Sequence, residues 1–123
     1  MNPILTVAFT AGATINPNRI VKFDATDSVV IQAAAATDAI LGVANYLGAA
    51  TGDRVDVCLV GLADVEYGGA ITRGALLTSD ANGKAVAAAP AAGVNNRIIG
   101  VAMVSGVSGD IAPVLINPNQ VQG

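Results

Sequence analysis

The chain has 123 residues and a formal net charge of −3 at pH 7, with no histidine and a single cysteine. The absence of histidine excludes Ser-His-Asp and Cys-His catalytic arrangements and histidine metal ligands, and one cysteine excludes an intrachain disulfide and cysteine-rich zinc sites. Apolar residues make up 53% of the chain but aromatic residues only 3% and charged residues 12%, about half of the roughly 25% usual in globular domains, so we expect one domain whose surface is largely covered by copies of itself or by another protein.

The distribution of charge and of apolar residues also limits the partners. The basic residues are scattered along the chain, with almost no aromatic residues among them: Arg19, Lys22, Arg54, Arg73, Lys84 and Arg97. Because binding to a phosphate backbone requires clustered Lys and Arg, we expect no direct contact with nucleic acid. No apolar run reaches the roughly 18 residues of a membrane helix, so we expect no membrane contact. The absence of disulfides is typical of a protein made in a reducing cytoplasm.

Residues 1–18 differ from the rest of the chain because they contain no charged side chain before Arg19. The stretch Ile4–Thr10 is rich in strand-forming residues and is bounded by Pro3 and Gly12. A neutral, extended segment of this kind is either the first strand of the domain's own sheet or an arm that adds a strand to a neighbouring chain. We interpret residues 1–18 as an extended N-terminal arm and leave both positions open.

Residues 19–116 show the alternation and turn chemistry of a β domain. Arg19–Asp24 alternates polar and apolar residues, as a half-buried strand does. The run Ala33–Ala36 favours helix by propensity but is cut short by Thr37 and Asp38. This run is therefore either a helical turn or a tightly packed strand.

A strand–turn–strand unit occurs twice, in Ile40–Val60 and in Ile98–Ile116. Each copy has an apolar strand, a small-residue turn, a Gly-Asp pair and a second apolar strand. The offset is 58 residues at the first strand (Gly100 against Gly42) and 57 at the Gly-Asp pair (110 minus 53), so the loops differ by one residue. Two weak copies are too few for a solenoid, which needs three or more repeats, and indicate a small barrel or sandwich with a repeated hairpin.

Turn signals also separate the short strand patterns between the two copies. Asn82-Gly83 is the strongest of them, because both residues tolerate the positive φ of a two-residue hairpin turn. Eight to ten short strands and at most one short helix predict an all-β fold, a small barrel or sandwich over residues 19–116. The polar residues 117–123 are expected to fray as a C-terminal tail.

The chain offers few groups for catalysis. Asp53 and Asp110 occupy matching places, each after a glycine, Gly52 or Gly109, and before a strand. They are either paired acids or calcium ligands, or each accepts backbone N–H bonds within its own turn, and we favour the second interpretation. We therefore expect no catalytic residue, no cofactor and no bound metal, and a protein that is not an enzyme.

Other side chains in these strands have simple interpretations. Asp56, Asp64 and Glu66 alternate with apolar neighbours, which predicts a solvated acidic face able to pair with basic residues of a partner. Cys58 lies in an apolar strand pattern and is expected to be a buried, inert thiol. An enzyme that shares Asp53, Asp56 and Asp110 between the subunits of a trimer is a weaker alternative.

The stretch Gly74–Val86, followed by Arg97–Ala102, resembles the capsid cement (head-decoration) proteins of tailed bacteriophages. Ile40–Ala44 and Gly52–Val57 are similar to the same family, as is the near-neutral N-terminal arm. The resemblance spans the chain from about Phe9 to Ile116. It rests on turn and strand patterns and not on catalytic signatures.

The resemblance implies a small β-rich protein, commonly a homotrimer, on the outer surface of an icosahedral head at three-fold and quasi-three-fold positions. Its implied partners are the major capsid protein and its own copies, and its implied location is the virion, after synthesis in the host cytoplasm. We expect the arm side chains to contact the capsid: Ile4, Leu5, Val7 and Phe9. On this view, deletion of residues 1–18 leaves a folded oligomer that no longer binds heads. The alternative is another trimeric β-rich virion module, such as a fibre base or a tail-associated protein.

Overall fold

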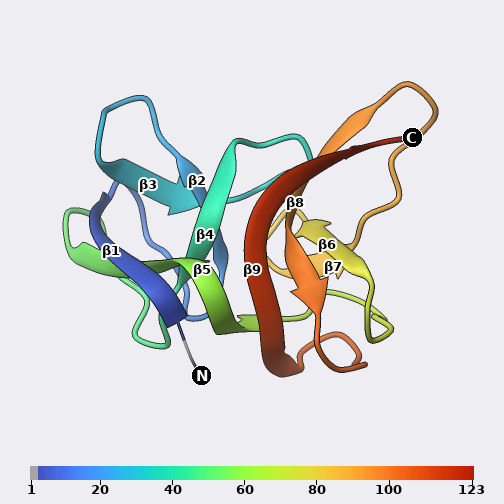
Figure 1. Cartoon of the computed structure of the whole chain (residues 1–123). Coiled ribbons are helices and arrows are strands. Elements are labelled where there is room, and N and C mark those ends of the chain that lie inside the picture. The colour runs from blue at the N-terminus through green and yellow to red at the C-terminus, as the bar shows by residue number, and fades with distance from the viewer. Residues whose placement is uncertain (1–2) are drawn as a thin grey trace.

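The computed structural model describes residues 3–123, which form one nine-stranded sheet (Figure 1). The strands are β1 (Pro3–Ala11), β2 (Ile20–Phe23), β3 (Val29–Gln32), β4 (Ile40–Ala44), β5 (Arg54–Glu66), β6 (Leu76–Ser79), β7 (Ala85–Ala87), β8 (Asn95–Ala102) and β9 (Ile111–Gln122). Their order in the sheet is β1-β3-β2-β4-β5-β9-β8-β6-β7, with an additional pairing of β1 with β5. The all-β prediction is confirmed, although the sheet is not clearly closed into one barrel. The described part of the chain contains no helix that could cross a membrane.

β1 belongs to the domain's own sheet. It pairs antiparallel with β5 along nearly its whole length, from Pro3 to Thr10, and Thr10 and Ala11 pair parallel with β3. Of the two positions that the sequence leaves open for residues 1–18, the structure shows the first one for residues 3–11.

Two other segments differ from what their composition suggests. Residues 117–122 do not fray, as expected for a polar tail, because they form the second half of β9 and pair with β8 around residues 95–98. The run Ala33–Ala36 forms neither helix nor strand: it bends at Ala35 and enters a hydrogen-bonded turn at Ala36, in which the Asp38 N–H donates to the Ala35 carbonyl oxygen at 3.3 Å. The Asp38 carboxylate holds this bend by accepting a hydrogen bond from the Ala34 N–H at 2.8 Å.

The two hairpins predicted as copies are both present, and their registers correspond. Val43 lies opposite Cys58 in β4 and β5, and Val101 lies opposite Leu115 in β8 and β9. The offsets are 58 residues (101 minus 43) and 57 residues (115 minus 58), the same values that the sequence gives. The prediction of a repeated hairpin is confirmed.

The duplication extends beyond these hairpins to the two halves of the chain. Ala11 pairs in parallel with Val30, and Tyr67 pairs in parallel with Ala85, so β1 corresponds to the second half of β5 and β3 corresponds to β7. The order β3-β2-β4-β5-β9-β8-β6-β7 therefore reads as a palindrome about the β5–β9 pair. β5 is shared, because its first half pairs with β1 and its second half with β9.

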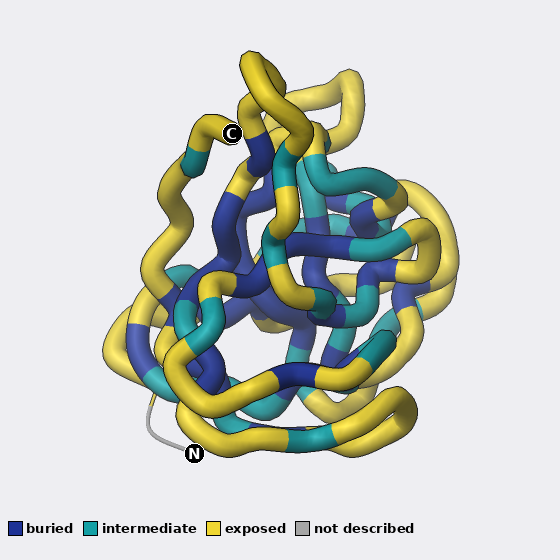
Figure 2. Tube along the Cα trace, turned by 90° about the vertical axis from the view of Figure 1, so that its right-hand side faces the viewer, coloured by how far each residue is buried: buried dark blue, intermediate teal, exposed yellow. Residues whose placement is uncertain are grey.

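Each half contributes its own core, and Figure 2 shows the buried segments gathered inside a periphery of exposed loops. The core of the first half consists of Ala11, Ile15, Val21, Val30, Leu41, Ala44, Val55 and Val57. At offsets of 55 to 58 residues, their counterparts all belong to the second core: Tyr67, Ile71, Leu77, Ala85, Ile99, Ala102, Ala112 and Val114. The second core also contains Ile20, Ile40 and Val43 of the first half. The two halves are thus packed together by a shared apolar seam.

Candidate functional site

β1 is exposed along most of its length. From its first residue to Ala8 every residue of β1 is exposed, and β-bulges interrupt its pairing with β5 between Pro3 and Thr6. Ile4 is 80% exposed, Leu5 46% and Val7 36%. Phe9 is partly buried against the core of the first half. Of the four arm side chains expected to contact a partner, three are therefore accessible, whereas Phe9 contributes to the fold.

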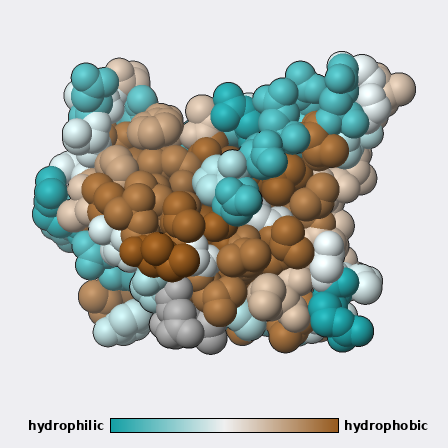
Figure 3. Space-filling view, viewed as in Figure 1, coloured by the Kyte–Doolittle hydropathy of each residue, from teal (hydrophilic) through white to brown (hydrophobic). Residues whose placement is uncertain are grey.

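A row of apolar side chains crosses four neighbouring strands. Leu62, Leu115, Val101 and Leu76 lie opposite one another in β5, β9, β8 and β6. Because directly opposite residues of antiparallel strands point to the same face, they form one continuous line, which we call the apolar row. Leu76 is 45% exposed and Leu115 43%, and the other two are partly buried. Figure 3 shows apolar residues over much of the molecular face that it presents.

The predicted Gly-Asp residues lie in turns that are repeated in the two halves. Gly52 and Gly109 have φ values of 88° and 93°, in the left-handed region that favours glycine. The Asp110 carboxylate accepts a hydrogen bond from the Val107 N–H at 2.9 Å, as expected for an aspartate that stabilises its own turn. No group of three or more acidic, histidine or cysteine side chains that could hold a metal occurs in residues 3–123.

The turn at Asn82-Gly83 connects β6 and β7, but an aspartate organises it. The Asp80 carboxylate accepts hydrogen bonds from the backbone N–H groups of Asn82 at 2.8 Å and Lys84 at 2.9 Å. Gly83 has a φ of 72°, whereas Asn82 keeps a negative φ. The turn is therefore not the two-residue type with positive φ at both positions that Asn-Gly indicates.

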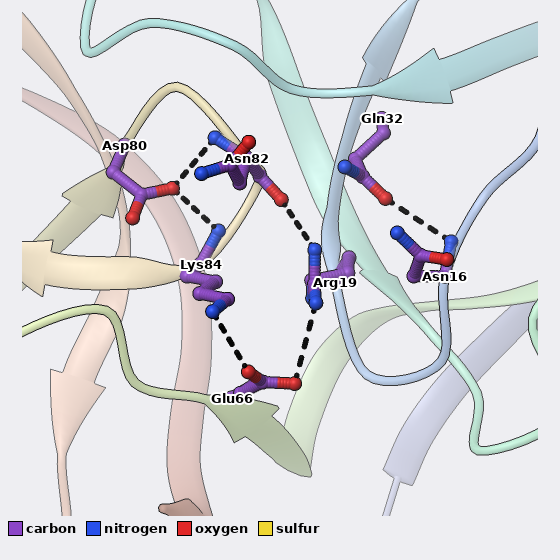
Figure 4. Close-up of polar contacts among 7 residues, drawn as sticks. All are labelled: Asn16, Arg19, Gln32, Glu66, Asp80, Asn82 and Lys84. Carbon is purple, nitrogen blue, oxygen red and sulfur yellow. Dashed lines mark hydrogen bonds and ion pairs between the residues drawn. The ribbon is translucent and has the colours of Figure 1, made fainter. Parts of the chain in front are cut away.

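A polar cluster joins the two halves where the β6–β7 hairpin meets the segment before β2 (Figure 4). The Glu66 carboxylate forms ion pairs with Arg19 at 3.4 Å and with Lys84 at 3.1 Å, and Arg19 also donates to the carbonyl oxygen of Asn82 at 2.8 Å. Burial raises the pKa of Glu66, but the hydrogen bond from Lys84 and the charges of Arg19 and Lys84 outweigh this effect, so its pKa lies below the ordinary value. We call these four residues the inter-half cluster.

The acidic face predicted in β5 is divided between two environments. Glu66 belongs to the inter-half cluster, whereas Asp56 is exposed, Asp64 is partly buried, and neither forms an ion pair with another residue of the described chain. Cys58 is a free, buried thiol whose pKa is raised by burial, as the apolar strand pattern predicts. Asp56 and Asp64 are therefore the carboxylates of this strand that remain available to a partner.

Comparison with known proteins shows what kind of molecule presents these surfaces. The family model for phage cement proteins matches residues 1–115. The chain belongs to this family. Among solved structures, this cement-family chain is similar to the head fiber gp8.5 N base in bacteriophage phi29, with a TM-score of 0.68 and 20% sequence identity over 92% of this chain and 93% of that chain. At this identity the likeness shows the fold alone. No curated protein matches the chain.

Membership of the cement family implies association with a phage capsid. The sequence indicates β1 as a contact segment but misses the apolar row and the inter-half cluster. The row spans strands that are distant in sequence, and its residues become neighbours only through strand pairing. The cluster lies in loops and strand ends, where polar residues follow no period.

Proposed function

We propose that this chain decorates and stabilises the outer surface of an icosahedral phage head, as a homotrimer at three-fold and quasi-three-fold positions. In this proposal β1 contacts the major capsid protein, and the apolar row is the contact between copies of the chain. The protein is made in the host cytoplasm and acts on the virion. Its role is structural and includes no catalytic step.

The exposure of apolar side chains on β1, in a chain of the cement family, is the observation that supports this proposal most directly. Ile4 is 80% and Leu5 46% exposed on β1, beside the β-bulges that interrupt its pairing with β5 between Pro3 and Thr6. Removing apolar surface from water is favourable by about 25 cal/mol per Å². A partner that covers these side chains of β1 therefore gains free energy from each of them.

Several weak contacts are sufficient if the protein binds as a trimer. Once one copy is attached, the contacts of the other two become effectively intramolecular, and the overall affinity rises without new contacts. Neighbouring capsid subunits are then held together by the trimer that bridges them. A chain with few charged residues and modest individual contacts is suited to this mechanism.

The test is co-sedimentation of the purified protein with undecorated heads. The double variant Ile4→Ser/Leu5→Ser is expected to lose at least about tenfold in occupancy, because it removes two exposed apolar side chains from β1. Both positions are exposed, so the fold should be retained. The matched control is Phe23→Ser/Val94→Ser, which changes apolar residues of similar exposure, 54% and 42%, outside β1.

The outcomes separate the parts of the proposal. Wild-type occupancy for the β1 variant would show that β1 is not the capsid contact. Failure of the wild-type protein to bind heads would contradict head decoration itself. Equal losses in the β1 variant and in the control would mean that the loss is not specific to β1.

A second candidate function follows from the likeness to the head fiber base. A fibre base is the trimeric β-rich virion module that the sequence leaves as an alternative, and in that role this chain would attach a fibre. A pull-down with the other virion proteins of the same phage distinguishes the two. Stoichiometric capture of a fibre protein would favour the fibre base.

A further inference from the structure

The apolar row has a counterpart in the first half of the chain. The strand registers equate three of its residues with three residues there, at offsets of 56 (76 minus 20), 58 (101 minus 43) and 57 (115 minus 58): Leu76 with Ile20, Val101 with Val43, and Leu115 with Cys58. The fourth residue, Leu62, corresponds to Thr6 of β1, which is exposed. We call Ile20, Val43 and Cys58 the first-half row, because they cross neighbouring strands in the same way.

The two rows differ in what covers them. The first-half row is buried, with no residue more than 7% exposed, and all three side chains belong to the apolar core of the second half. β4, which carries Val43, also lies against β8 and β9. Leu76 and Leu115 of the apolar row, by contrast, are nearly half exposed. The second half therefore covers the row of the first half, whereas the corresponding face of the second half lies open in a single chain.

One part of that cover is the β6–β7 turn, residues 80–84. The Ile20 N–H donates to the Gly83 carbonyl oxygen at 2.8 Å, and Gly83 is buried. A Cβ atom at Gly83 would lie only 3.1 Å from the Ile20 carbonyl oxygen. A further hydrogen bond between the halves joins the Glu66 N–H to the carbonyl oxygen of the buried Asn18, at 3.0 Å. The turn and the Ile20 end of the first-half row are thus in direct backbone contact.

The first half carries the same turn between β2 and β3, at residues 24–28. The N–H groups of Asp24 and Asp80 each donate across their turn, at 3.0 and 2.9 Å, to the carbonyl oxygen at its far end. Ser28 has a φ of 63° and Gly83 one of 72°, which is the same left-handed conformation. Residues 24–28 are all exposed, whereas Gly83 is buried. The β2–β3 turn thus has the backbone of the β6–β7 turn but no row to contact.

The contact between the halves is therefore made once within the chain, and each of its two sides is present a second time without a partner. The unpartnered sides are the apolar row of the second half and the β2–β3 turn of the first half. Figure 1 shows this turn and strands β6 and β8 on opposite sides of the molecule, so the two sides do not meet within one chain. Another copy of the chain supplies the missing side of each.

The charges at the two unpartnered sides are complementary. In the contact within the chain, Arg19 donates to the carbonyl oxygen of Asn82 in the β6–β7 turn. The second half has Ala75 at the position of Arg19, but Arg73, two residues earlier, is exposed and forms no ion pair within residues 3–123. Asp27, the counterpart of Asn82, is exposed and likewise forms no ion pair with a described residue. An acidic turn and a basic neighbour of the row therefore match in charge.

We propose that the β2–β3 turn of a second copy docks on the apolar row, as the β6–β7 turn docks on the first-half row within one chain. The inference rests on the proposed function, in which the row joins copies, and it names the surface that the row receives. The contact is head-to-tail, because each copy offers its row to one neighbour and its turn to the other. Contacts of this kind form closed rings when the rotation between copies closes, and three copies give the proposed homotrimer.

The variant Ala25→Arg/Asp27→Arg tests the turn. Both positions are exposed, so the fold should be retained. We expect trimer formation in analytical ultracentrifugation to weaken at least about tenfold, because the new arginines face Arg73 of the neighbouring copy. The matched control Ala50→Arg/Asp53→Arg makes the same substitutions in another exposed turn and should associate as wild type does. Undiminished association of the turn variant, or an equal loss in the control, would overturn the proposal.

Mixing two defective variants distinguishes head-to-tail docking from contact of one row with another row. Leu76→Ser/Leu115→Ser keeps its turn, and Ala25→Arg/Asp27→Arg keeps its row. Neither should associate alone, but a mixture should form a one-to-one complex, since one intact row then meets one intact turn. At millimolar concentration, the unlabelled turn variant should shift the amide NMR signals of residues 24–28 in the isotope-labelled row variant, whereas the unlabelled row variant should not. Unshifted signals in the mixture would contradict docking of the turn on the row.

Head binding separates this inference from the proposed function. If wild-type protein decorates heads as a trimer and the turn variant also forms trimers, the mode of docking is wrong, although decoration stands. If wild-type protein neither forms trimers nor binds heads, the proposed function fails, whatever the mixed variants show. Decoration by the wild type together with complex formation between the two variants supports both.

Discussion

At the scale of single residues, Gly100 has the most tightly enclosed position in the repeated hairpins. A Cβ atom at Gly100 would overlap the carbonyl oxygen of Leu115, and one at the corresponding Gly42 would overlap that of Cys58. We predict that Gly100→Ala lowers the free energy of unfolding by about 3 kcal/mol or more, because backbone atoms must move. The control Gly74→Ala meets nothing within 4 Å and should cost about 1 kcal/mol, for its positive φ alone. Equal losses in urea unfolding would contradict the packing argument.

Equivalent positions in the two halves carry side chains of different size, which explains why the sequence reveals only part of the duplication. Ala11 and Val30 face each other in the first half, and Tyr67 and Ala85 do so in the second. The large side chain has moved to the other partner, and Gly106 leaves room for the Tyr67 ring. Such an exchange of side-chain size erases the identity between the copies. The glycines and the Gly-Asp turns are retained in both halves because the backbone geometry at these positions allows no similar exchange. The repeated hairpins could therefore be predicted from the sequence. The correspondence of β1, β2 and β3 with the second half of β5, β6 and β7 could not.

The candidate site was predictable only where it is continuous in sequence. Ile4–Val7 forms an uncharged strand pattern next to the chain's start, so a contact segment could be inferred from it. Asn18 lies in a loop, where nothing in the sequence distinguishes a buried amide from a solvated one. Its burial arises from the packing of distant segments, which composition and periodicity do not determine.

At the scale of elements, the position of β1 changes the expected result of deleting residues 1–18. The deletion would remove a strand paired along nearly all of β5's first half, together with the buried Ala11 and Ile15. Loss of a buried isoleucine alone costs about 2–5 kcal/mol, against a total stability of about 5–15 kcal/mol. We predict that the truncated protein does not fold, and far-UV circular dichroism with soluble yield checks this. A folded truncated chain would show that the fold does not require β1. Because the deletion is expected to unfold the protein, point variants in β1 are the better test of its contact with the capsid.

The inter-half cluster makes the docking of the β6–β7 hairpin sensitive to acid. The pKa of Glu66 is lowered in the folded state, so its contribution is fully present above its ordinary value of 4.5 and is lost as the pH falls through the folded-state value. We predict that Glu66→Gln destabilises the protein by about 1 kcal/mol at pH 7, because Arg19 and Lys84 lose their shared partner.

Urea midpoints at pH 7 and at about pH 3 check this prediction. The difference between wild type and Glu66→Gln should shrink on acidification, because the wild-type carboxylate takes up a proton as the pH falls through its folded-state pKa, which lies below the ordinary value. Burial raises the pKa of Asp38, but its hydrogen bonds from Ala34 and Lys22 outweigh this effect, so its pKa lies below the ordinary value. The loss of stability in acid that comes from Asp38 is the same in wild type and in Glu66→Gln, so it does not affect the difference between them. A constant difference between the two pH values would show that the ion pairs of Glu66 do not stabilise the fold.

At the scale of the whole molecule, the chain is compact without a partner. Its accessible surface is 5874 Å², close to the about 6,000 Å² expected for a folded monomer of its 12.1 kDa mass. One folded chain is therefore as compact as a typical monomer of this mass. What distinguishes this molecule is the composition of its surface, where few charges and several exposed apolar side chains leave patches that association can cover.

Association should consequently depend on concentration and on the apolar row. We predict that wild-type protein sediments as a trimer at micromolar concentration and dissociates to folded monomers on dilution. Leu76→Ser/Leu115→Ser should remain monomeric but folded, because both side chains are nearly half exposed and contribute little to the core. Ile4→Ser/Leu5→Ser should still form trimers, since in the proposed function β1 contacts the capsid and not another copy of the chain.

Analytical ultracentrifugation measures the oligomeric state of each variant, and circular dichroism measures whether it is folded. Trimers of the Leu76/Leu115 variant, or monomers of the wild type up to tens of micromolar, would show that the apolar row does not join copies in solution.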